Sequence, residues 1–250
     1  MLSGIIVKSG VLGIIRVVYF IFGAEFLKGS WVQKVFLGLA LGTVFLGSML
    51  AYLEKGLKKR LAYSTVSQVS YILFGLLLLN PAGMTGAFLH VIFHAVIKSG
   101  LFLCAGAIIF RTGKTRVDEL RGIGKEMPVT IGCMTLLSLA LIGIPPASGF
   151  VSKWYLAVGS LSSETGFYSW LGPVVLLLSA LLTAGYLLPI TMKGFFPGEE
   201  ESRKGFVRKE ADSVMLVPIL LLAVLAVVLG MFPGGLISLI SNIAQQLFQM

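Results

Sequence analysis

Long apolar segments alternate with short polar ones along the whole chain. Seven of them reach the roughly 20 residues that a helix needs to cross the hydrocarbon core of a bilayer. They cover residues 1–23, 31–53, 60–80, 83–110, 129–158, 167–194 and 213–232, each to within a few residues. The pattern predicts an all-α polytopic membrane protein with about seven transmembrane helices.

The last apolar stretch, residues 236–250, follows Pro233-Gly234-Gly235. Its apolar side chains recur at the three- and four-residue spacing of one helix face. They are Leu236, Leu239, Ile240, Ile243, Leu247 and Phe248. We expect an amphipathic helix at the membrane interface rather than an eighth span.

One predicted span contains a strong helix breaker. In LIGIPPASGFVSKWYL, residues 141–156, Pro145 and Pro146 lie between Gly143 and Gly149, and Lys153 follows. Proline removes a backbone donor and clashes with the preceding turn, so we expect the helix to break within the membrane. Broken helices at that depth line cavities or binding sites. The alternative is an ordinary proline kink, with Lys153 reaching the membrane surface.

The composition agrees with this topology. Hydrophobic residues make up 56% of the 250 residues and the mean hydropathy is +0.94, against an apolar share of about 45–50% in soluble domains. The net charge is +9, but fourteen of the twenty Lys and Arg lie in loops 54–60, 111–128 and 193–212, while the opposite side holds Lys28 and Lys34. By the positive-inside rule, the N-terminus is cytoplasmic and the C-terminus lies outside. This placement leaves no basic surface for nucleic acid.

Redox chemistry is not expected in this chain. Cys104 and Cys133 stand alone in apolar segments, without the spacing of an iron–sulfur or disulfide framework. All eleven Asp and Glu fall in loops or at span ends. We therefore expect no cofactor in this chain and no carboxylate inside the membrane.

Ionisable side chains do occur inside the predicted spans. HVIFHAVIK, residues 90–98, places His90, His94 and Lys98 four residues apart, which puts them on one helix stripe at steps of about 6 Å. Intramembrane ionisable groups commonly mark ion or proton paths, and such a stripe suits a proton relay. The alternative is that the histidines only bind neighbouring helices. A metal site is not favoured, because no acidic residue accompanies the histidines.

Two further polar features accompany this stripe. Lys8 lies about a third of the way into the first span. Serines and a glutamine in KRLAYSTVSQVSY, residues 59–71, either line a hydrated interior or join helices to each other; they are Ser64, Ser67, Gln68 and Ser70.

Three segments occur together, in this order: KRLAYSTVSQVSY, HVIFHAVIKSGLF and GIPPASGFVSKWYL. With DELRGIGKEMP at 118–128, they resemble the antiporter-like, proton-translocating subunits of respiratory complex I, Mrp-type sodium/proton antiporters and membrane-bound hydrogenases. The resemblance covers roughly residues 1–195. Members of this family typically have fourteen helices, with inverted five-helix repeats at helices 4–8 and 9–13.

The resemblance implies a domain organisation and roles for single residues. Residues 1–30 correspond to family helix 8, 31–195 to the second repeat (helices 9–13), and 196–250 to the last transmembrane helix and the interfacial helix. Lys8 corresponds to the lysine that links the two half-channels. His90, His94 and Lys98 correspond to the polar axis on helix 11. Lys153 corresponds to the residue on broken helix 12 that exchanges protons with the outside.

The first repeat of the family, with its glutamate and lysine, has no counterpart here. We therefore expect other membrane subunits as partners, one of which supplies that repeat or an intramembrane carboxylate. The leading hypothesis is an ion-translocating subunit, most simply for protons, in the plasma or an energy-transducing inner membrane. A subunit that completes a partner without carrying ions is the alternative. An intramembrane enzyme is disfavoured, because no nucleophile–base pair or carboxylate–metal set is present.

Overall fold

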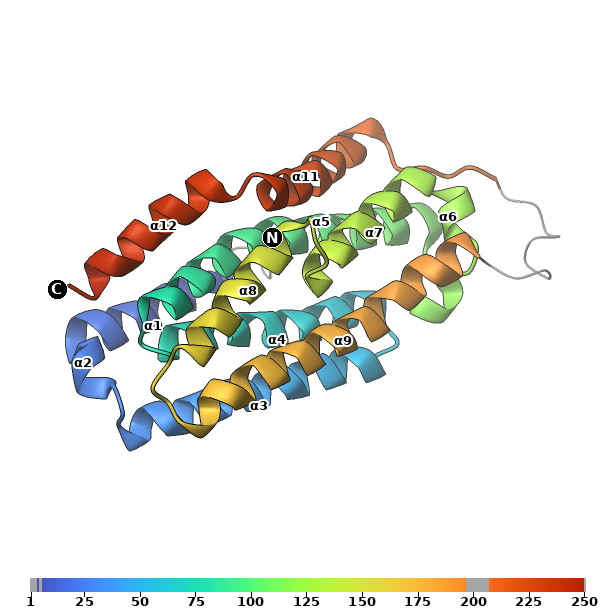
Figure 1. Cartoon of the computed structure of the whole chain (residues 1–250). Helices are drawn as coiled ribbons and strands as arrows, with labels where there is room; N and C mark the ends of the chain where they lie inside the picture. Colours follow the sequence, from blue (N-terminus) through green and yellow to red (C-terminus); the bar gives the residue numbers. More distant parts are fainter. Residues whose placement is uncertain (1–3, 5, 197–206, 250) are drawn as a thin grey trace.

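Helices build the described part of the chain (Figure 1). The computed structural model describes residues 4, 6–196 and 207–249, and within these ranges the only β-type pairing is an isolated bridge between Gly56 and Arg116. The helices, in chain order, are α1 (Lys8–Ile15), the π-helix η2 (Arg16–Phe22), α2 (Ala24–Leu27), α3 (Trp31–Leu53), α4 (Leu57–Leu77), α5 (Pro81–Thr112), the 3₁₀-helix η3 (Val117–Leu120), α6 (Ile123–Glu126), α7 (Pro128–Ile142), α8 (Ser148–Leu161), α9 (Phe167–Phe195), α11 (Ser213–Met231) and α12 (Gly234–Leu247).

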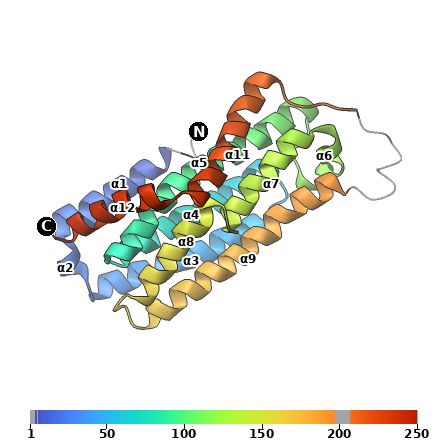
Figure 2. The ribbon, with the colours of Figure 1, turned by 45° about the horizontal axis from the view of Figure 1, so that its top comes forward.

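The long helices run side by side in one bundle, as expected of a helical membrane protein (Figures 1 and 2). Four described helices are long and apolar enough to cross a membrane: α3, α5, α9 and α11. The other predicted spans do not meet that criterion. Helix α4 carries Lys58, Lys59 and Arg60 in its first turn, and two predicted spans are divided into α1 with η2 and α7 with α8. The predicted count of seven is therefore not confirmed by length and composition.

The predicted break is present between α7 and α8. Helix α7 ends at Ile142, and Gly143 adopts a left-handed backbone conformation with φ +94°, which glycine allows without a steric penalty. Pro145 and Pro146 lie in the connection, and α8 begins at Ser148. Gly149, expected in the break, belongs to the first turn of α8.

Helix α12 does not lie where an interfacial helix would. Its Ala244 shares an apolar cluster with Met84 of α5 and Val11 of α1, whereas Leu222 of the preceding α11 lies beside Gly100, further along α5. Helices α11 and α12 thus follow α5 lengthwise, and both views show α12 running beside α1 (Figures 1 and 2). The expectation of an interfacial helix was wrong, because the apolar face of this segment packs against the bundle.

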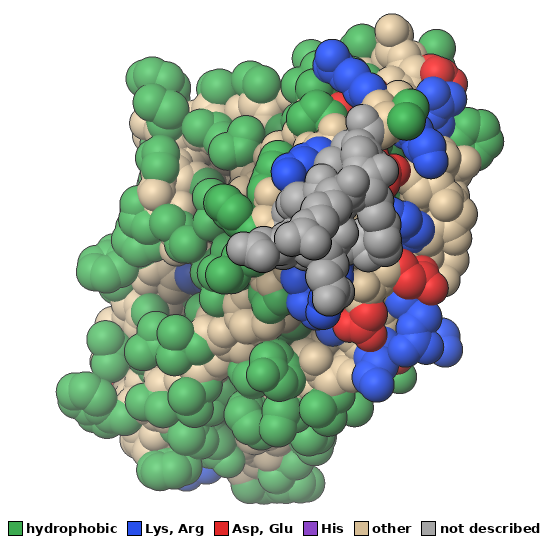
Figure 3. Space-filling model, turned by 90° about the vertical axis from the view of Figure 1, so that its right-hand side faces the viewer, with side chains coloured by type: hydrophobic (Ala, Val, Ile, Leu, Met, Phe, Trp, Pro, Cys, Tyr) green, Lys and Arg blue, Asp and Glu red, His purple; other side chains and the backbone are tan. Residues whose placement is uncertain are grey.

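The basic loops meet at one end of the bundle. The backbone N–H of Leu57 donates to the carbonyl of Thr115, and Lys193 pairs with Asp118 at 3.5 Å. Figure 3 views this end and shows Lys and Arg gathered there with a few acidic side chains. Arg203 and Lys204, two of the fourteen loop cations, lie outside the described residues. The single-sided distribution read from the sequence agrees with the folded arrangement.

Helix α5 occupies the middle of the bundle and contacts α4, α7, α8, α11 and α12. It approaches α8 closely because glycines line the contact. A Cβ on Gly86 would lie 2.7 Å from the backbone N of Leu156, and a Cβ on Gly159 would lie 2.6 Å from the Cα of Gly83. Small residues at helix crossings of membrane proteins permit such backbone contact.

We predict that Gly159→Ala separates α5 from α8. The added methyl group would meet backbone atoms of Gly83, which cannot rotate away, so the free energy of unfolding should fall by about 1–3 kcal/mol. Gly132→Ala in α7 is the matched control, because a Cβ there meets nothing within 4 Å, and its added helix propensity should be neutral or mildly stabilising. Unfolding in mixed detergent micelles, followed by circular dichroism, measures both. Equal stability of the two variants would contradict the close crossing.

Candidate functional site

A row of ionisable side chains runs along α5 in the bundle core. His90, His94 and Lys98 are all buried. The two imidazole rings stack with centroids 5.8 Å apart and planes inclined by 14°. The structure therefore brings these three residues together on one stripe, and we call them the α5 row.

His90 connects the α5 row to α4 and α8. Its Nδ1 lies 2.9 Å from Oγ of Ser152, and its Nε2 lies 3.1 Å from Oε1 of Gln68. The ring also stacks on Tyr71 with centroids 5.5 Å apart. The Ser152 hydroxyl is 3.2 Å from a second acceptor, the carbonyl of Gly149.

These contacts accommodate both protonation states of His90. In the neutral ring, Nε2–H donates to Gln68 and Nδ1 accepts from the hydroxyl of Ser152. In the imidazolium, Nδ1–H donates to Ser152 Oγ, and the hydroxyl proton of Ser152 turns to the carbonyl of Gly149. Only a hydroxyl rotation separates the two arrangements. His90 can therefore gain or lose a proton without moving a heavy atom.

His94 has a different environment. It is completely buried, and neither of its ring nitrogens has a hydrogen-bond partner among the described residues. The Nε2 of Gln68 is in the same situation. Buried polar atoms without partners are unusual and call for an explanation such as a catalytic or transport role. The ring nitrogens of His94 and the Nε2 of Gln68 therefore leave hydrogen-bonding atoms without described partners next to His90.

Lys98 lies at the end of the α5 row and is held by oxygen atoms rather than by a carboxylate. Its ammonium donates to the carbonyl of Leu61, at 2.9 Å, and to the hydroxyl of Ser64. The ion pairs found in the described part of the chain involve other cations, in loops and at helix ends. A buried lysine held only by neutral oxygens keeps its charge at a cost, so it is suited to exchanging its proton.

Lys153 closes the break between α7 and α8. From α8, its ammonium donates to the carbonyls of Leu141 and Ile142, at 2.7 and 2.8 Å. These carbonyls belong to the last turn of α7, where they lack helical partners and where the helix dipole favours a cation. The ammonium also lies 5.3 Å from the centre of the Tyr71 ring. The contacts of Lys153 therefore do not favour the alternative of an ordinary proline kink with this side chain reaching the membrane surface.

Lys8 approaches the row from α1. Its ammonium donates to the carbonyl of Gly4 in the preceding turn, and Gly4 packs against Ser99, next to Lys98 on α5.

The polar residues of α4 divide into two groups. Ser64 and Gln68 face the row, but Ser67 does not. The Ser67 hydroxyl contacts the carbonyl of Val44 and the hydroxyl of Ser48, each at 2.8 Å. It also lies 3.3 Å from the hydroxyl of Ser179. Ser67 joins α3, α4 and α9, and Ser70 likewise contacts Thr43 of α3. For these two serines, the structure favours the alternative of polar contacts between helices.

The sequence analysis did not identify two residues that contact the α5 row, Tyr71 and Ser152. Tyr71 lies seven residues after Ser64 and three after Gln68, so helical periodicity could have placed it on their face. Ser152 precedes Lys153, but no sequence signal shows that α8 turns this hydroxyl toward His90.

The chain was compared with known proteins. A family model described as "NADH:quinone oxidoreductase/Mrp antiporter, TM" matches residues 1–183. The chain belongs to this family.

Relatives within the NADH:quinone oxidoreductase/Mrp antiporter family come from several complexes. NADH-quinone oxidoreductase subunit N of Desulforudis audaxviator is 38% identical over 248 residues, which cover 95% of this chain and 48% of that protein. F(420)H(2) dehydrogenase subunit N of Methanosarcina mazei is 31% identical over 250 residues, covering 96% and 48%. The chain thus spans about half the length of these relatives.

Solved structures agree with this assignment. A chain in the Mrp complex from Dietzia sp. DQ12-45-1b superposes with a TM-score of 0.85 at 25% identity, covering 98% of this chain and 52% of that one. A chain in the membrane-bound sulfane sulfur reductase, an archaeal respiratory membrane complex, gives the same score and identity over 99% and 48%. A chain of respiratory complex I from Thermus thermophilus gives 0.79 at 25% identity, over 95% and 49%.

The contacts of the two histidines predict that substituting each by leucine has a different effect on the free energy of unfolding. His90→Leu leaves Oε1 of Gln68 without its donor and should lower the free energy of unfolding by about 1–3 kcal/mol. His94→Leu replaces a ring whose nitrogens bind no described residue, so it should be neutral or stabilising. Detergent unfolding of both variants measures the difference. Equal destabilisation would show that His94 has a partner of comparable strength.

Proposed function

We propose that this chain is an ion-translocating membrane subunit of a multisubunit assembly and that the translocated ion is the proton. Protons would move between Lys153 at the α7–α8 break and Lys8 on α1, through His90, His94 and Lys98. The observation that carries the proposal is the alignment of Lys153, His90, His94 and Lys98 in the interior of the bundle, with the Tyr71 ring between Lys153 and His90.

Distances along this series support the proposal. The Lys153 ammonium is 5.3 Å from the Tyr71 ring, that ring is 5.5 Å from His90, and His90 is 5.8 Å from His94. One helix turn, about 6 Å along α5, then leads to Lys98. A water bound to the unpartnered ring nitrogens of His94 would connect the neighbouring polar groups.

The chemistry of the row favours protons over sodium. Sodium, like other hard cations, prefers carboxylate and carbonyl oxygens. The α5 row instead offers imidazole and amine nitrogens, which bind protons, and Lys98 would repel a metal cation. A sodium path in a neighbouring subunit is compatible with this assignment.

Partners follow from the same features. The matched structures are chains of the Mrp complex, the sulfane sulfur reductase and complex I, so we infer that this chain also assembles with other membrane subunits. One of them would supply an intramembrane carboxylate to balance the buried lysines. The driving force would come from these neighbours.

Position within the family and orientation belong to the same proposal. Residues 1–30 would be family helix 8, residues 31–195 the second repeat, and 196–250 the last helices. The end with the basic loops would face the cytoplasm, which places the N-terminus inside and the C-terminus outside.

We predict that Lys98→Ala and Lys153→Ala each abolish proton movement while assembly persists. Each variant would be expressed in the native assembly, which is checked by native gel, and proton uptake would be followed in sealed membrane vesicles with a pH-sensitive dye. Uptake should fall to the level of vesicles that lack the subunit, because the row loses a proton carrier.

Lys58→Ala is the matched control, because Lys58 is exposed in the first turn of α4; uptake should be unchanged. Normal assembly with undiminished uptake in the Lys98 and Lys153 variants would overturn the relay. It would favour the alternative that the chain completes its partners without carrying ions.

A further inference from the structure

The buried side-chain amide of Gln68 is bound at one end only. Its Oε1 lies 3.1 Å from Nε2 of His90, whereas its own Nε2 has no hydrogen-bond partner among the described residues. The oxygen and nitrogen of an amide are nearly equal in size, so a half-turn about the Cγ–Cδ bond exchanges them in place. Because nothing described binds Nε2, this half-turn of Gln68 disturbs only the bond to His90.

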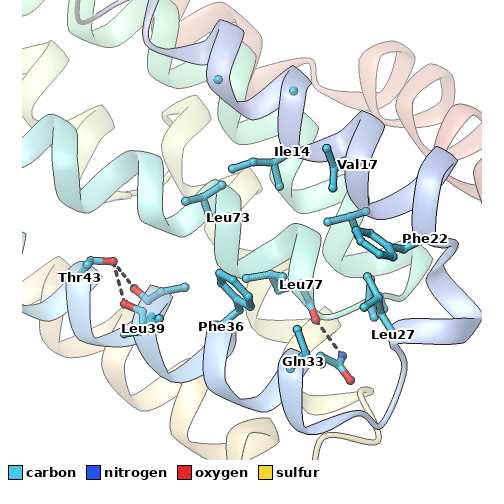
Figure 4. A pocket seen from close by; sticks show the side chains of 16 residues that line it. Ile14, Val17, Phe22, Leu27, Gln33, Phe36, Leu39, Thr43, Leu73 and Leu77 are labelled. Atoms are coloured by element: carbon cyan, nitrogen blue, oxygen red, sulfur yellow. Dashed lines mark hydrogen bonds between the residues drawn. The ribbon is translucent and has the colours of Figure 1, made fainter.

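A second buried glutamine shows the contrast. In Gln33 of α3, Oε1 accepts from the N–H of Gly29, and Nε2 donates to the carbonyl of Leu77, each at 2.8 Å. Figure 4 shows the bond to Leu77. A half-turn of this amide would set donor against donor and acceptor against acceptor, so it would break both bonds. The amide of Gln33 is therefore fixed, and that of Gln68 is not.

Ser152, which faces the other nitrogen of His90, can also reverse its role. Its Oγ lies 2.9 Å from Nδ1 of His90 and 3.2 Å from the carbonyl oxygen of Gly149. The hydroxyl either donates to Nδ1, or accepts from Nδ1–H and sends its own proton to Gly149. Both ring nitrogens of His90 thus face a partner that can act as a donor or as an acceptor.

The His90 ring itself has little room to turn. It stacks on Tyr71 with planes inclined by 17° and on His94 with planes inclined by 14°, and all three rings are buried. Rotation about the Cβ–Cγ bond would drive the edges of the ring into these neighbours, because protein interiors are closely packed. When a proton changes nitrogen, the partners of His90 must therefore adjust instead of the ring.

Two neutral tautomers of His90 fit these partners. With its proton on Nε2, the ring donates to Oε1 of Gln68 and accepts from Ser152 at Nδ1. With its proton on Nδ1, the ring donates to Ser152, and its Nε2 becomes an acceptor. Oε1 of Gln68 would then repel Nε2 of the ring, because both atoms carry lone pairs. The half-turn of Gln68 removes this repulsion by presenting an N–H group to the ring.

We propose that Gln68 is a positioning residue whose amide makes this half-turn each time a proton passes through His90. The inference rests on the proposed function, since it concerns how the relay works. A proton enters at Nδ1, where the Ser152 hydroxyl gives up its own proton and takes another from the side of Lys153. The imidazolium then loses the proton on Nε2. An amide oxygen does not carry a proton onward, so the amide turns and the proton passes to a water beside His94.

NMR spectra of the isotope-labelled imidazole nitrogens test this in the chain purified with any subunits that accompany it. The chain has two histidines, and signals that disappear in His90→Leu but persist in His94→Leu belong to His90. At alkaline pH, where imidazole is neutral, we expect the nitrogen shifts of both tautomers or their average. The shifts of the Nε2–H tautomer alone, as for an amide that never turns, would overturn the proposal.

Two substitutions should lock opposite tautomers. Gln68→Met removes the acceptor that faces Nε2, so the ring proton should stay on Nδ1, where Ser152 accepts it. Ser152→Ala removes the partner of Nδ1, so the ring proton should stay on Nε2, where Gln68 accepts it. In each variant one tautomer loses a hydrogen bond, so proton uptake by vesicles should fall about tenfold. Gln68→His introduces a neutral ring with one donor and one acceptor and should keep uptake near the unsubstituted rate.

Ser70→Ala, also in α4, is the matched control. Ser70 contacts Thr43 and the carbonyl of Val66 rather than His90, so neither the tautomers nor the uptake should change. Unsubstituted tautomers or unsubstituted uptake in Gln68→Met would contradict the role of Gln68.

The inference and the proposed function fail in different ways. If Lys98→Ala and Lys153→Ala abolish uptake while Gln68→Met transports normally, the relay stands and the role of Gln68 is overturned. If the two lysine variants transport normally, the relay itself is overturned, and the role of Gln68 with it.

Discussion

The ammonium of Lys153 on the last carbonyls of α7 is the contact on which the core arrangement depends. Breaking a helix inside a membrane exposes backbone oxygens that lipid cannot satisfy. Here the second half-helix supplies the missing donor, since Lys153 binds the carbonyls of Leu141 and Ile142. The absence of a side chain at Gly143 leaves room for the lysine stem, whose Cδ would lie 3.0 Å from a Cβ there. The break and the Lys153 cation stabilise each other.

Other elements fit around this contact. Gly230 of α11 packs directly against the backbone of Pro146, Ala147 and Ser148, where a side chain would collide. Ser152, one residue before Lys153, contacts His90. The connection between α7 and α8 is thereby held from α11 on one side and linked to the α5 row on the other. A movement of the α7–α8 connection would therefore alter the contact between the Ser152 hydroxyl and His90.

Buried lysines in this bundle share one feature: backbone carbonyls or hydroxyls hold them. Lys8 binds the carbonyl of Gly4, and Lys98 binds the carbonyl of Leu61 and the hydroxyl of Ser64. Neutral oxygens stabilise an ammonium less than a carboxylate does, and they tolerate the neutral amine. A strong buried ion pair would instead fix the charge. The arrangement therefore suits groups that change protonation state during turnover.

The pattern of apolar residues along the chain predicted the positions of most of the long helices. It placed α3 at residues 31–53, as observed, and the proline–glycine cluster located the break, because both signals are local. It failed for the last segment, since an amphipathic pattern does not say whether the apolar face meets lipid headgroups or helices α1 and α5. Spacing alone also found His90, His94 and Lys98. Side chains that join the row from other helices depend on helix rotation. For this reason Ser152 was missed, and the two alternatives for Ser67 could not be distinguished from the sequence.

Substitution of Lys153 by arginine tests the central claim most directly. A guanidinium can still donate to Leu141 and Ile142, but it does not release its proton. In the native assembly, we expect Lys153→Arg to keep the hydrogen-exchange protection of Gly143 and Ile144, whose N–H groups donate to the carbonyl of Leu139, while proton uptake by vesicles falls to background. Proton uptake at the unsubstituted rate would contradict the role of Lys153 as a proton carrier.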